Sequence, residues 1–164
     1  MNKLKQLETK DNFASLLGFK NSKYINYILY SVGTDHLYKT FSIPKKNGGE
    51  RIIHAPKEKL KRLQRKLAAV LWDCYVESLE IKSKNKKFKI PAISHAFEKD
   101  KSIITNAQIH RNKKYVLNVD LKDYFDSFNF GRVRGFFLKD ATFKVPEEIA
   151  TVIAQIACYK GKLP

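Results

Sequence analysis

Apolar residues recur at intervals of three and four in several stretches of this 164-residue chain. Such spacing puts them on one face of a helix, so each stretch predicts an amphipathic helix. The stretches are residues 3–17, the segment after the Asn21–Ser22 cap, 58–79, 100–110, 128–139 and the segment that starts at Pro146. Proline suits a first helical position, and the segment after Pro146 has its apolar stripe at Ile149, Val152, Ile153 and Ile156.

Two further patterns are typical of strands. The runs YKTFSIPKK and ERIIHAP flank Asn47-Gly48-Gly49, and these turn residues accept the positive φ of a tight hairpin. Pro44 and Pro56 indicate an edge position, because proline cannot donate to an interior ladder. The run YVLNVDL at 115–121 is dense in apolar and β-branched residues, and it predicts a buried strand.

The charge balance adds the prediction of a polyanionic partner. Lys and Arg number 32 against 16 Asp and Glu, which gives a net charge of +16. Such an excess indicates nucleic acid. The chain has no run of roughly 18 apolar residues and no apolar signal region at its start, so we expect a cytoplasmic protein without membrane contact. Cys74 and Cys158 are expected to be reduced thiols.

Many of the positive charges gather at the start of the 58–79 helix. The cations there include Lys57, Lys61, Arg62 and Arg65. Cations near a helix N-terminus oppose the macrodipole, and a bound anion would offset that cost. The alternative is a merely solvated basic face. A second basic segment, residues 81–89, holds five lysines and no acid.

Three carboxylates interrupt this basic background: Asp120, Asp123 and Asp126 fall within seven residues. A carboxylate at the end of a buried strand is costly unless it is paired, hydrogen-bonded or bound to a metal. Mg²⁺ takes hard oxygen ligands, so the pattern indicates metal-dependent phosphoryl transfer on nucleic acid. The alternative is that Asp120 forms a turn or caps a helix. Asp126 is predicted to be the N-cap of the following helix.

The segment YVLNVDLKDYFDSFNFGRVRGFF resembles the first palm motif of bacterial retron-type reverse transcriptases and their group II intron relatives. Other segments are similar to further parts of that family in the same order: IPKKNGGERIIHAPKEKLKRLQRKL and SHAFEKDKSIITNAQIH to the fingers, and ACYKGKLP to the residues that lead into its Leu-Pro-Gln-Gly motif. The resemblance implies an α+β fold with an N-terminal helical extension (1–36), fingers (37–114) and the first part of a palm (115–164).

The resemblance also implies roles for single residues. Asp120 matches the catalytic aspartate that ligates both Mg²⁺ ions, and Phe125 matches the steric gate that favours deoxynucleotides, with a plain core position as the alternative. The residues that would contact the incoming dNTP are Lys45, Arg51, Asp123, Tyr124 and Phe125. Those that would follow the RNA backbone are Lys57, Lys61, Arg62 and Arg65. Lys46 is a weaker dNTP candidate, because adjacent strand residues point to opposite faces.

The chain departs from the family pattern after Leu163-Pro164. It has no Gln-Gly there and no Asp-Asp dipeptide anywhere, so the Tyr-x-Asp-Asp motif is missing. We therefore expect an N-terminal fragment of an RNA-directed DNA polymerase, inactive alone and prone to self-associate through an open strand edge at 115–121. The complete enzyme would copy a structured noncoding RNA in phage defence, with an effector protein as a further partner. The alternatives are a non-catalytic RNA-binding protein that retains the fingers and a small Mg²⁺-dependent nuclease.

Overall fold

The computed structural model describes residues 3–46, 48–84, 94–96, 98 and 100–164. Its residues form two compact units, Met1–Ser78 with Asp123–Pro164, and Leu79–Lys122. The described part combines helices with one two-stranded antiparallel sheet, so the expected α+β class is confirmed at that level. The assignment of residue ranges to an extension, fingers and palm stays a prediction.

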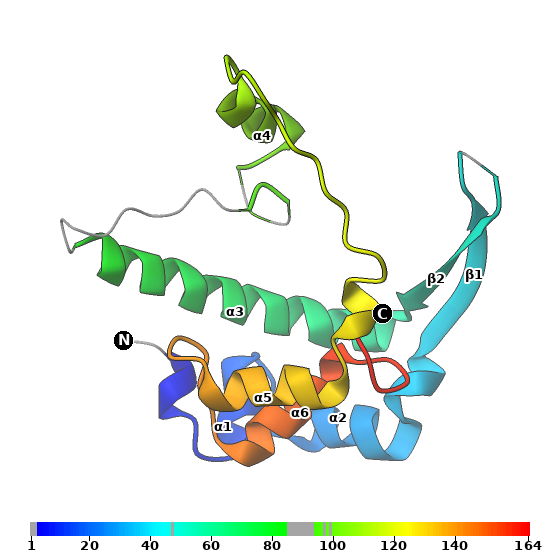
Figure 1. Ribbon diagram of the computed structural model, residues 1–164. Helices are drawn as coiled ribbons and strands as arrows, with labels where there is room; N and C mark the ends of the chain where they lie inside the picture. Colours follow the sequence, from blue (N-terminus) through cyan, green and yellow to red (C-terminus); the bar gives the residue numbers. More distant parts are fainter. Residues whose placement is uncertain (1–2, 47, 85–93, 97, 99) are drawn as a thin grey trace. The chain divides into compact units, whose positions relative to one another are not determined.

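The first unit contains most of the regular structure (Figure 1). Its helices are α1 (Lys10–Leu16), α2 (Lys23–Asn26), α3 (Glu58–Ser83, whose end belongs to the second unit), α5 (Phe130–Lys139) and α6 (Glu147–Ala157). Its strands are β1 (Tyr38–Pro44) and β2 (Glu50–Pro56). Short 3-10 turns cover Lys3–Gln6, Thr34–Leu37 and Phe125–Ser127, and a π-helix covers Tyr27–Val32. The second unit contains α4 (Ile103–His110), and Ser102 is its N-cap.

The N-terminal region differs from the single helix predicted over 3–17. A 3-10 turn ends at Gln6, and α1 begins only after Thr9. The Thr9 hydroxyl accepts from the Asn12 amide N–H at 3.1 Å, while the Asn12 side chain accepts from the Thr9 N–H at 3.2 Å. This reciprocal capping box starts a new helix, which is why the apolar periodicity continues across a break in the backbone.

The hairpin is confirmed in its position and in its edge character. Tyr38 pairs with Pro56 and Pro44 with Glu50, so both prolines lie at the ends of the ladder. The turn is closed by a hydrogen bond from the Lys45 N–H to the Gly49 carbonyl at 3.0 Å. Gly48 and Gly49 have φ of 85° and 80°, which only glycine adopts at little cost. Asn47 lies outside the described residues.

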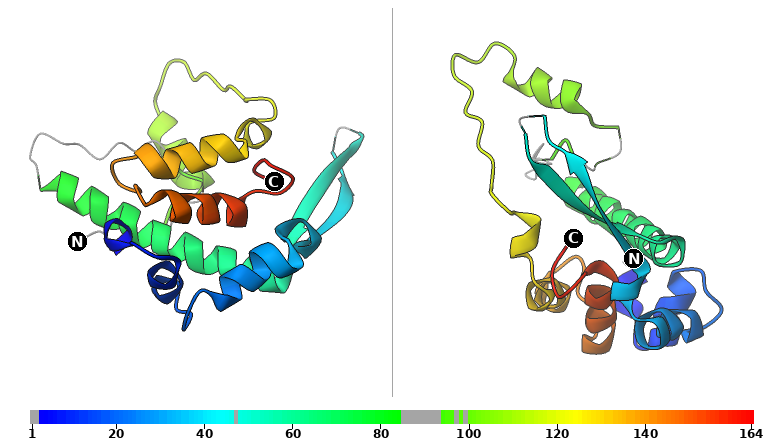
Figure 2. Two further views of the ribbon diagram at one scale, coloured as in Figure 1. Left: turned by 90° about the horizontal axis from the view of Figure 1, so that it is seen from below. Right: turned by 90° about the vertical axis from the view of Figure 1, so that its right-hand side faces the viewer.

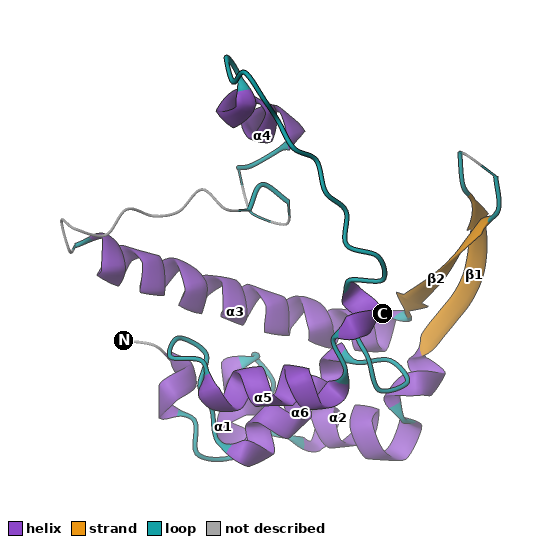
Figure 3. Ribbon diagram, in the orientation of Figure 1, coloured by secondary structure: helices purple, strands orange, loops and turns teal. Residues whose placement is uncertain are grey.

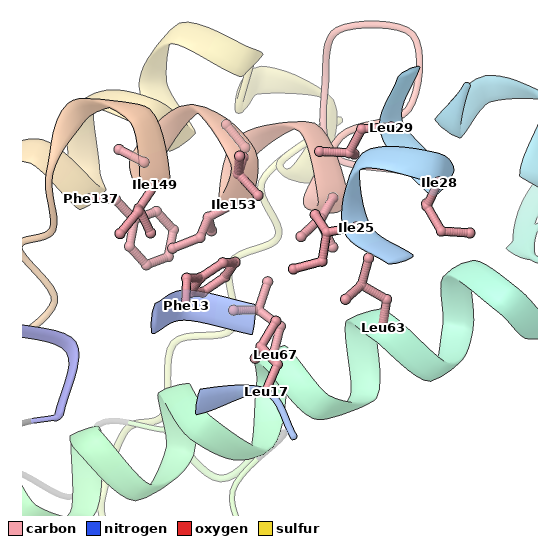
Figure 4. Packing of buried hydrophobic residues seen from close by; sticks show 14 of the residues in the cluster. Phe13, Leu17, Ile25, Ile28, Leu29, Leu63, Leu67, Phe137, Ile149 and Ile153 are labelled. Atoms are coloured by element: carbon pink, nitrogen blue, oxygen red, sulfur yellow. The ribbon is translucent and has the colours of Figure 1, made fainter. Parts of the chain in front are cut away.

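The core of the first unit lies between α3, the N-terminal helices and the α5–α6 pair (Figures 2 and 4). The four residues of the predicted α6 stripe, Ile149, Val152, Ile153 and Ile156, are at most 1% exposed. They meet Leu63 and Leu67 of α3 and Phe13 of α1 in one apolar cluster. Burial of such side chains contributes roughly 1.5–3 kcal/mol each, so this cluster fixes the helices from which the hairpin extends.

Residues 115–121 do not form the buried strand that their pattern predicts. They run as loop between α4 and the 3-10 turn at Phe125 (Figure 3). Tyr115, Leu117 and Val119 are 82%, 85% and 78% exposed. A strand needs a neighbour that satisfies its backbone N–H and C=O groups, and among the described residues β1 and β2 pair only with each other. The apolar pattern alone therefore does not make the strand.

The cap of α5 also differs from the prediction. Asn129, and not Asp126, is the N-cap, because the Asn129 side chain accepts from the Arg132 N–H at 2.9 Å. Asp126 lies in the preceding 3-10 turn and forms an ion pair with Lys162. Pro146 lies one position earlier than predicted, as the residue that precedes the first residue of α6.

Candidate nucleotide and nucleic-acid interface

Three cations meet at the turn end of the hairpin. Lys45, Lys46 and Arg51 line one pocket of about 460 Å³, whose other walls are Ile43 and Pro44. Arg51 is paired with Ile43 across the ladder, and directly paired residues of antiparallel strands project to the same face. Lys45 follows Ile43 by two positions, just past the end of β1, and lines the same pocket.

Lys46, the weaker dNTP candidate, lines the same pocket as Lys45. β1 ends at Pro44, and the chain turns through Gly48 and Gly49 directly afterwards. The alternation of side chains holds only within the strand, so it does not separate Lys45 from Lys46. The pocket therefore has three cationic side chains, where the pattern of the strand predicted two.

The predicted RNA-binding cations lie on exposed positions around the start of α3. Lys57, Lys61, Arg62 and Arg65 are all exposed, and none forms an ion pair with a carboxylate of the described residues. Lys57 donates to the His36 carbonyl at 2.9 Å, which ties this turn to the segment before the hairpin. Their contact with nucleic acid stays a prediction. Of the basic segment 81–89, Ile81–Ser83 extend α3, and residues 85–89 lie outside the described residues.

Asp120, the predicted metal ligand, is exposed and lies in the loop of the second unit. Its carboxylate has the hard oxygens that Mg²⁺ takes. Within the described ranges, however, no three His, Cys, Asp or Glu side chains group in a way that could hold a metal ion. Asp126 is engaged by Lys162. The Asp120 carboxylate thus suits one ligand position of a Mg²⁺ site. The described residues supply no further ligands that would complete such a site.

The residues that follow Asp120 form a small aromatic group in the first unit. The Tyr124 ring packs edge-on against Phe125 and Phe128, with centroids 5.4 and 5.1 Å apart. Phe125 is 50% exposed, so the alternative that it is a core residue is wrong. Asp123 has φ of 51°, a strained value for a residue with a side chain, and its carbonyl accepts from the Ser127 N–H at 3.1 Å. The steric-gate and dNTP roles of these residues stay predictions.

The two cysteines are free and buried. Burial raises the pKa of the thiols of Cys74 and Cys158, which keeps them protonated near neutral pH. Both lie in the hydrophobic cluster and not beside the cationic pocket. Within the described part of the chain, no helix combines the length and the apolar character that crossing a membrane needs.

Comparison with known proteins supports a particular class. The chain is 41% identical over 101 residues to the retron Mx65 reverse transcriptase of Myxococcus xanthus, a match that covers 62% of this chain and 21% of that relative. It is 33% identical over 139 residues to the retron Mx162 enzyme of the same organism, covering 84% of this chain and 26% of the relative. It is 31% identical over 132 residues to the retron Ec86 reverse transcriptase of Escherichia coli, covering 79% and 36%.

All three relatives are reverse transcriptases. The chain is a homologue of the bacterial retron reverse transcriptases, the family that its motifs resemble. It spans about a fifth to a third of the length of the three relatives just described. No family profile matches the chain. No solved structure matches it either.

Proposed function

We propose that the chain is the nucleotide- and template-binding part of an RNA-directed DNA polymerase of the retron type, with the fingers and the start of the palm between residues 37 and 164. The observation that carries the proposal is the convergence of Lys45, Lys46 and Arg51 on one pocket at the hairpin turn. The kinship with retron reverse transcriptases supports it.

The pocket suits the triphosphate of a dNTP. Three cationic side chains offset most of the charge of a triphosphate, and the planar guanidinium of Arg51 can bond two phosphate oxygens at once. The remaining lining, Ile43 and Pro44, is apolar, and the three cations are exposed, so their charges are accessible to a phosphate from solvent.

The basic start of α3 suits the backbone of the RNA template. Its exposed cations carry no ion pair with the described carboxylates, so they are available to phosphates. Such contacts position a nucleic acid and read no sequence. A retron noncoding RNA as template, an effector protein as partner and a role in phage defence are proposed on the same kinship.

Asp120 is proposed as one carboxylate ligand of a magnesium site in the complete polymerase. Mg²⁺ would supply charge neutralisation and an activated hydroxyl at the site of phosphoryl transfer. The part that this chain performs is to present the Asp120 oxygens, while Lys45 and Arg51 hold the triphosphate. We expect no primer extension by this chain alone.

The test is nucleotide binding by the 164-residue chain, measured by equilibrium dialysis with radiolabelled dTTP and no added divalent metal. Arg51→Gln should weaken dTTP binding by about tenfold, since a hydrogen bond to a charged group contributes about 1.5–3 kcal/mol. Arg51→Lys should recover only part of the loss, because an ammonium lacks the two-pronged fork.

Lys39→Gln is the matched control. Lys39 is an exposed lysine of β1 on the same face as Ile43. It lies roughly 20 Å from Lys45 along the strand, at 3.3 Å per residue. The control removes the same charge and should leave dTTP binding within about twofold, as expected for a surface change. Equal weakening by Lys39→Gln and Arg51→Gln would mean that net charge, and not the pocket, attracts the nucleotide, and the proposal would fail.

A further inference from the structure

Aromatic side chains of the N-terminal helices and lysines of α3 form a connected row, here named the aromatic–lysine strip. Its members are Phe19, Tyr24, Tyr27, Lys59 and Lys66. Phe19 stacks on Tyr24 with centroids 4.8 Å apart and planes at 19°. The Lys66 ammonium lies 5.1 Å from the centre of the Phe19 ring, and the Lys59 ammonium lies 5.3 Å from that of Tyr27. The Tyr24 hydroxyl donates to the Lys59 carbonyl at 3.1 Å, which joins the two halves of the strip.

Part of the strip has a structural role and part does not. Phe19 and Tyr24 pack against the core cluster, so they hold the N-terminal helices on α3. Tyr27 is different, because 44% of it is exposed and it is no member of that cluster. The Lys59 ammonium is 3.5 Å from the Tyr27 hydroxyl and farther from the ring centre, so it lies toward the hydroxyl end. Tyr27 is therefore partly open to a ligand.

The backbone at Tyr27 is also unusual. Tyr27 begins the π-helix Tyr27–Val32, which continues α2 without a break. π-Helical turns are rare and occur frequently at functional sites. The wider turn buries Ile28 and Leu29 while Tyr27 stays at the surface. An exposed aromatic ring beside a lysine therefore stands at the start of an irregular helical segment.

Three cations of α3 lie along the strip. Arg62 lies three residues after Lys59 and four before Lys66, so the three cations share one side of α3 over roughly 10 Å. None of them forms an ion pair with a described carboxylate. A row of cations next to an exposed aromatic ring combines the two contacts by which single-stranded nucleic acids are held without sequence preference.

We propose that the aromatic–lysine strip binds single-stranded RNA, with a base stacked on the exposed ring of Tyr27 and the backbone phosphates on Lys59, Arg62 and Lys66. This inference deepens the proposed function, on which it rests for the identity of the polyanion as RNA. It adds a contact surface whose residues are not those that line the hairpin pocket. The RNA would thereby be held by stacking as well as by charge.

The test is binding of a fluorescein-labelled, unstructured 20-nucleotide RNA to the 164-residue chain, measured by fluorescence anisotropy at several salt concentrations. Tyr27→Leu should weaken RNA binding about fivefold or more. Loss of the stacking between one base and an aromatic ring lowers affinity by about fivefold at the lower end of its usual range. Tyr27→Trp should restore binding, since indole also stacks. Phe136→Leu is the matched control, because Phe136 is 46% exposed on α5 away from the strip, and it should bind RNA as the unaltered chain does.

Lys59→Gln tests the charged half of the strip and does not depend on the Tyr27 variant being folded. It should lower the slope of log affinity against log salt by about 1, as loss of one phosphate contact does. An RNA that carries 5-iodouridine should crosslink on irradiation to the peptide that contains Tyr27, and mass spectrometry locates the adduct. Melting curves by circular dichroism verify that each variant is folded.

The outcomes separate this inference from the proposed function. RNA affinity that is unchanged in folded Tyr27→Leu, with no crosslink at Tyr27, overturns the strip as an RNA site and leaves the dTTP result at Arg51 intact. A chain that binds no RNA at all overturns both the strip and the template role of α3. Binding of a ten-residue polyglutamate peptide with the same dependence on Tyr27 would show an acidic protein surface as the partner, and would also overturn it.

Discussion

Gln64 joins three elements of the first unit through one side-chain amide. Its Nε2 donates to the Tyr38 hydroxyl at the start of β1 and to the Ile156 carbonyl near the end of α6, both at 2.9 Å. Tyr38 is 7% exposed, so its hydroxyl has little water to bond instead. Burial raises the pKa of Tyr38, and the bond from Gln64 opposes that rise. The hairpin that carries Lys45 and Arg51 is thus fixed at its base by this amide.

We predict that Gln64→Met lowers the free energy of unfolding by about 2 kcal/mol, because two part-buried acceptors each lose a bond with a net contribution of about 1 kcal/mol. Tyr38→Phe removes only one of the two bonds and should cost about 1 kcal/mol. In the Tyr38→Phe background, Gln64→Met should then cost only about 1 kcal/mol more, which gives a coupling energy of about 1 kcal/mol.

The assay is urea unfolding followed by the fluorescence of Trp72, the one tryptophan of the chain, which lies on α3. Gln108→Met is the control, because Gln108 is an exposed glutamine on α4, and it should change stability by less than about 0.5 kcal/mol. If the effects of Gln64→Met and Tyr38→Phe add to within about 0.3 kcal/mol, the two side chains do not interact and the reasoning is refuted.

Two further predictions concern the loop of the second unit that contains residues 115–121. Leu117→Lys should reduce self-association measured by sedimentation velocity, because Leu117 is 85% exposed in a β-prone run. The control Ile103→Lys changes an 87% exposed residue on α4 and should leave self-association unchanged. Equal effects of the two substitutions would exclude the loop as the contact. Asp120→Asn should remove dNTP incorporation from an enzyme completed with the remaining residues of a retron relative, and an unchanged rate there would favour the non-catalytic RNA-binding alternative.

The elements that the sequence predicts well are those whose partners are close along the chain. Leu60, Leu63 and Leu67 have helical spacing, and the backbone hydrogen bonds of a helix need no distant residue. The helix α3 forms as predicted, with these three residues buried. The hairpin is equally local, because Gly48 and Gly49 bring β2 back onto β1. The apolar stripe of α6 is predicted down to the residue, since one face of a helix meets the core whichever helices cover it.

Two features of the N-terminal region are not predicted by the spacing of apolar residues. The Thr9 capping box divides a stretch that reads as one helix, and the π-helix at Tyr27 follows a pattern that predicts an α-helix. Thr9 followed by Asn12 is a signal that could have shown the first break. Tyr27 and Tyr30 lie off the apolar stripe formed by Ile25, Ile28 and Leu29, which could have marked them as exposed aromatic residues.

Residues 115–121 show where such prediction stops. The pattern of Tyr115, Leu117 and Val119 describes side chains that suit a sheet, but the hydrogen bonds of a strand must come from another segment, and the described residues supply none. The same distinction applies to the hairpin pocket and to Asp120, which are two separate candidate sites. A local turn places Lys45 and Arg51 together, so their pocket follows from a few adjacent residues. A metal ligand acts only with other ligands, so the role of Asp120 depends on residues that its own segment does not specify.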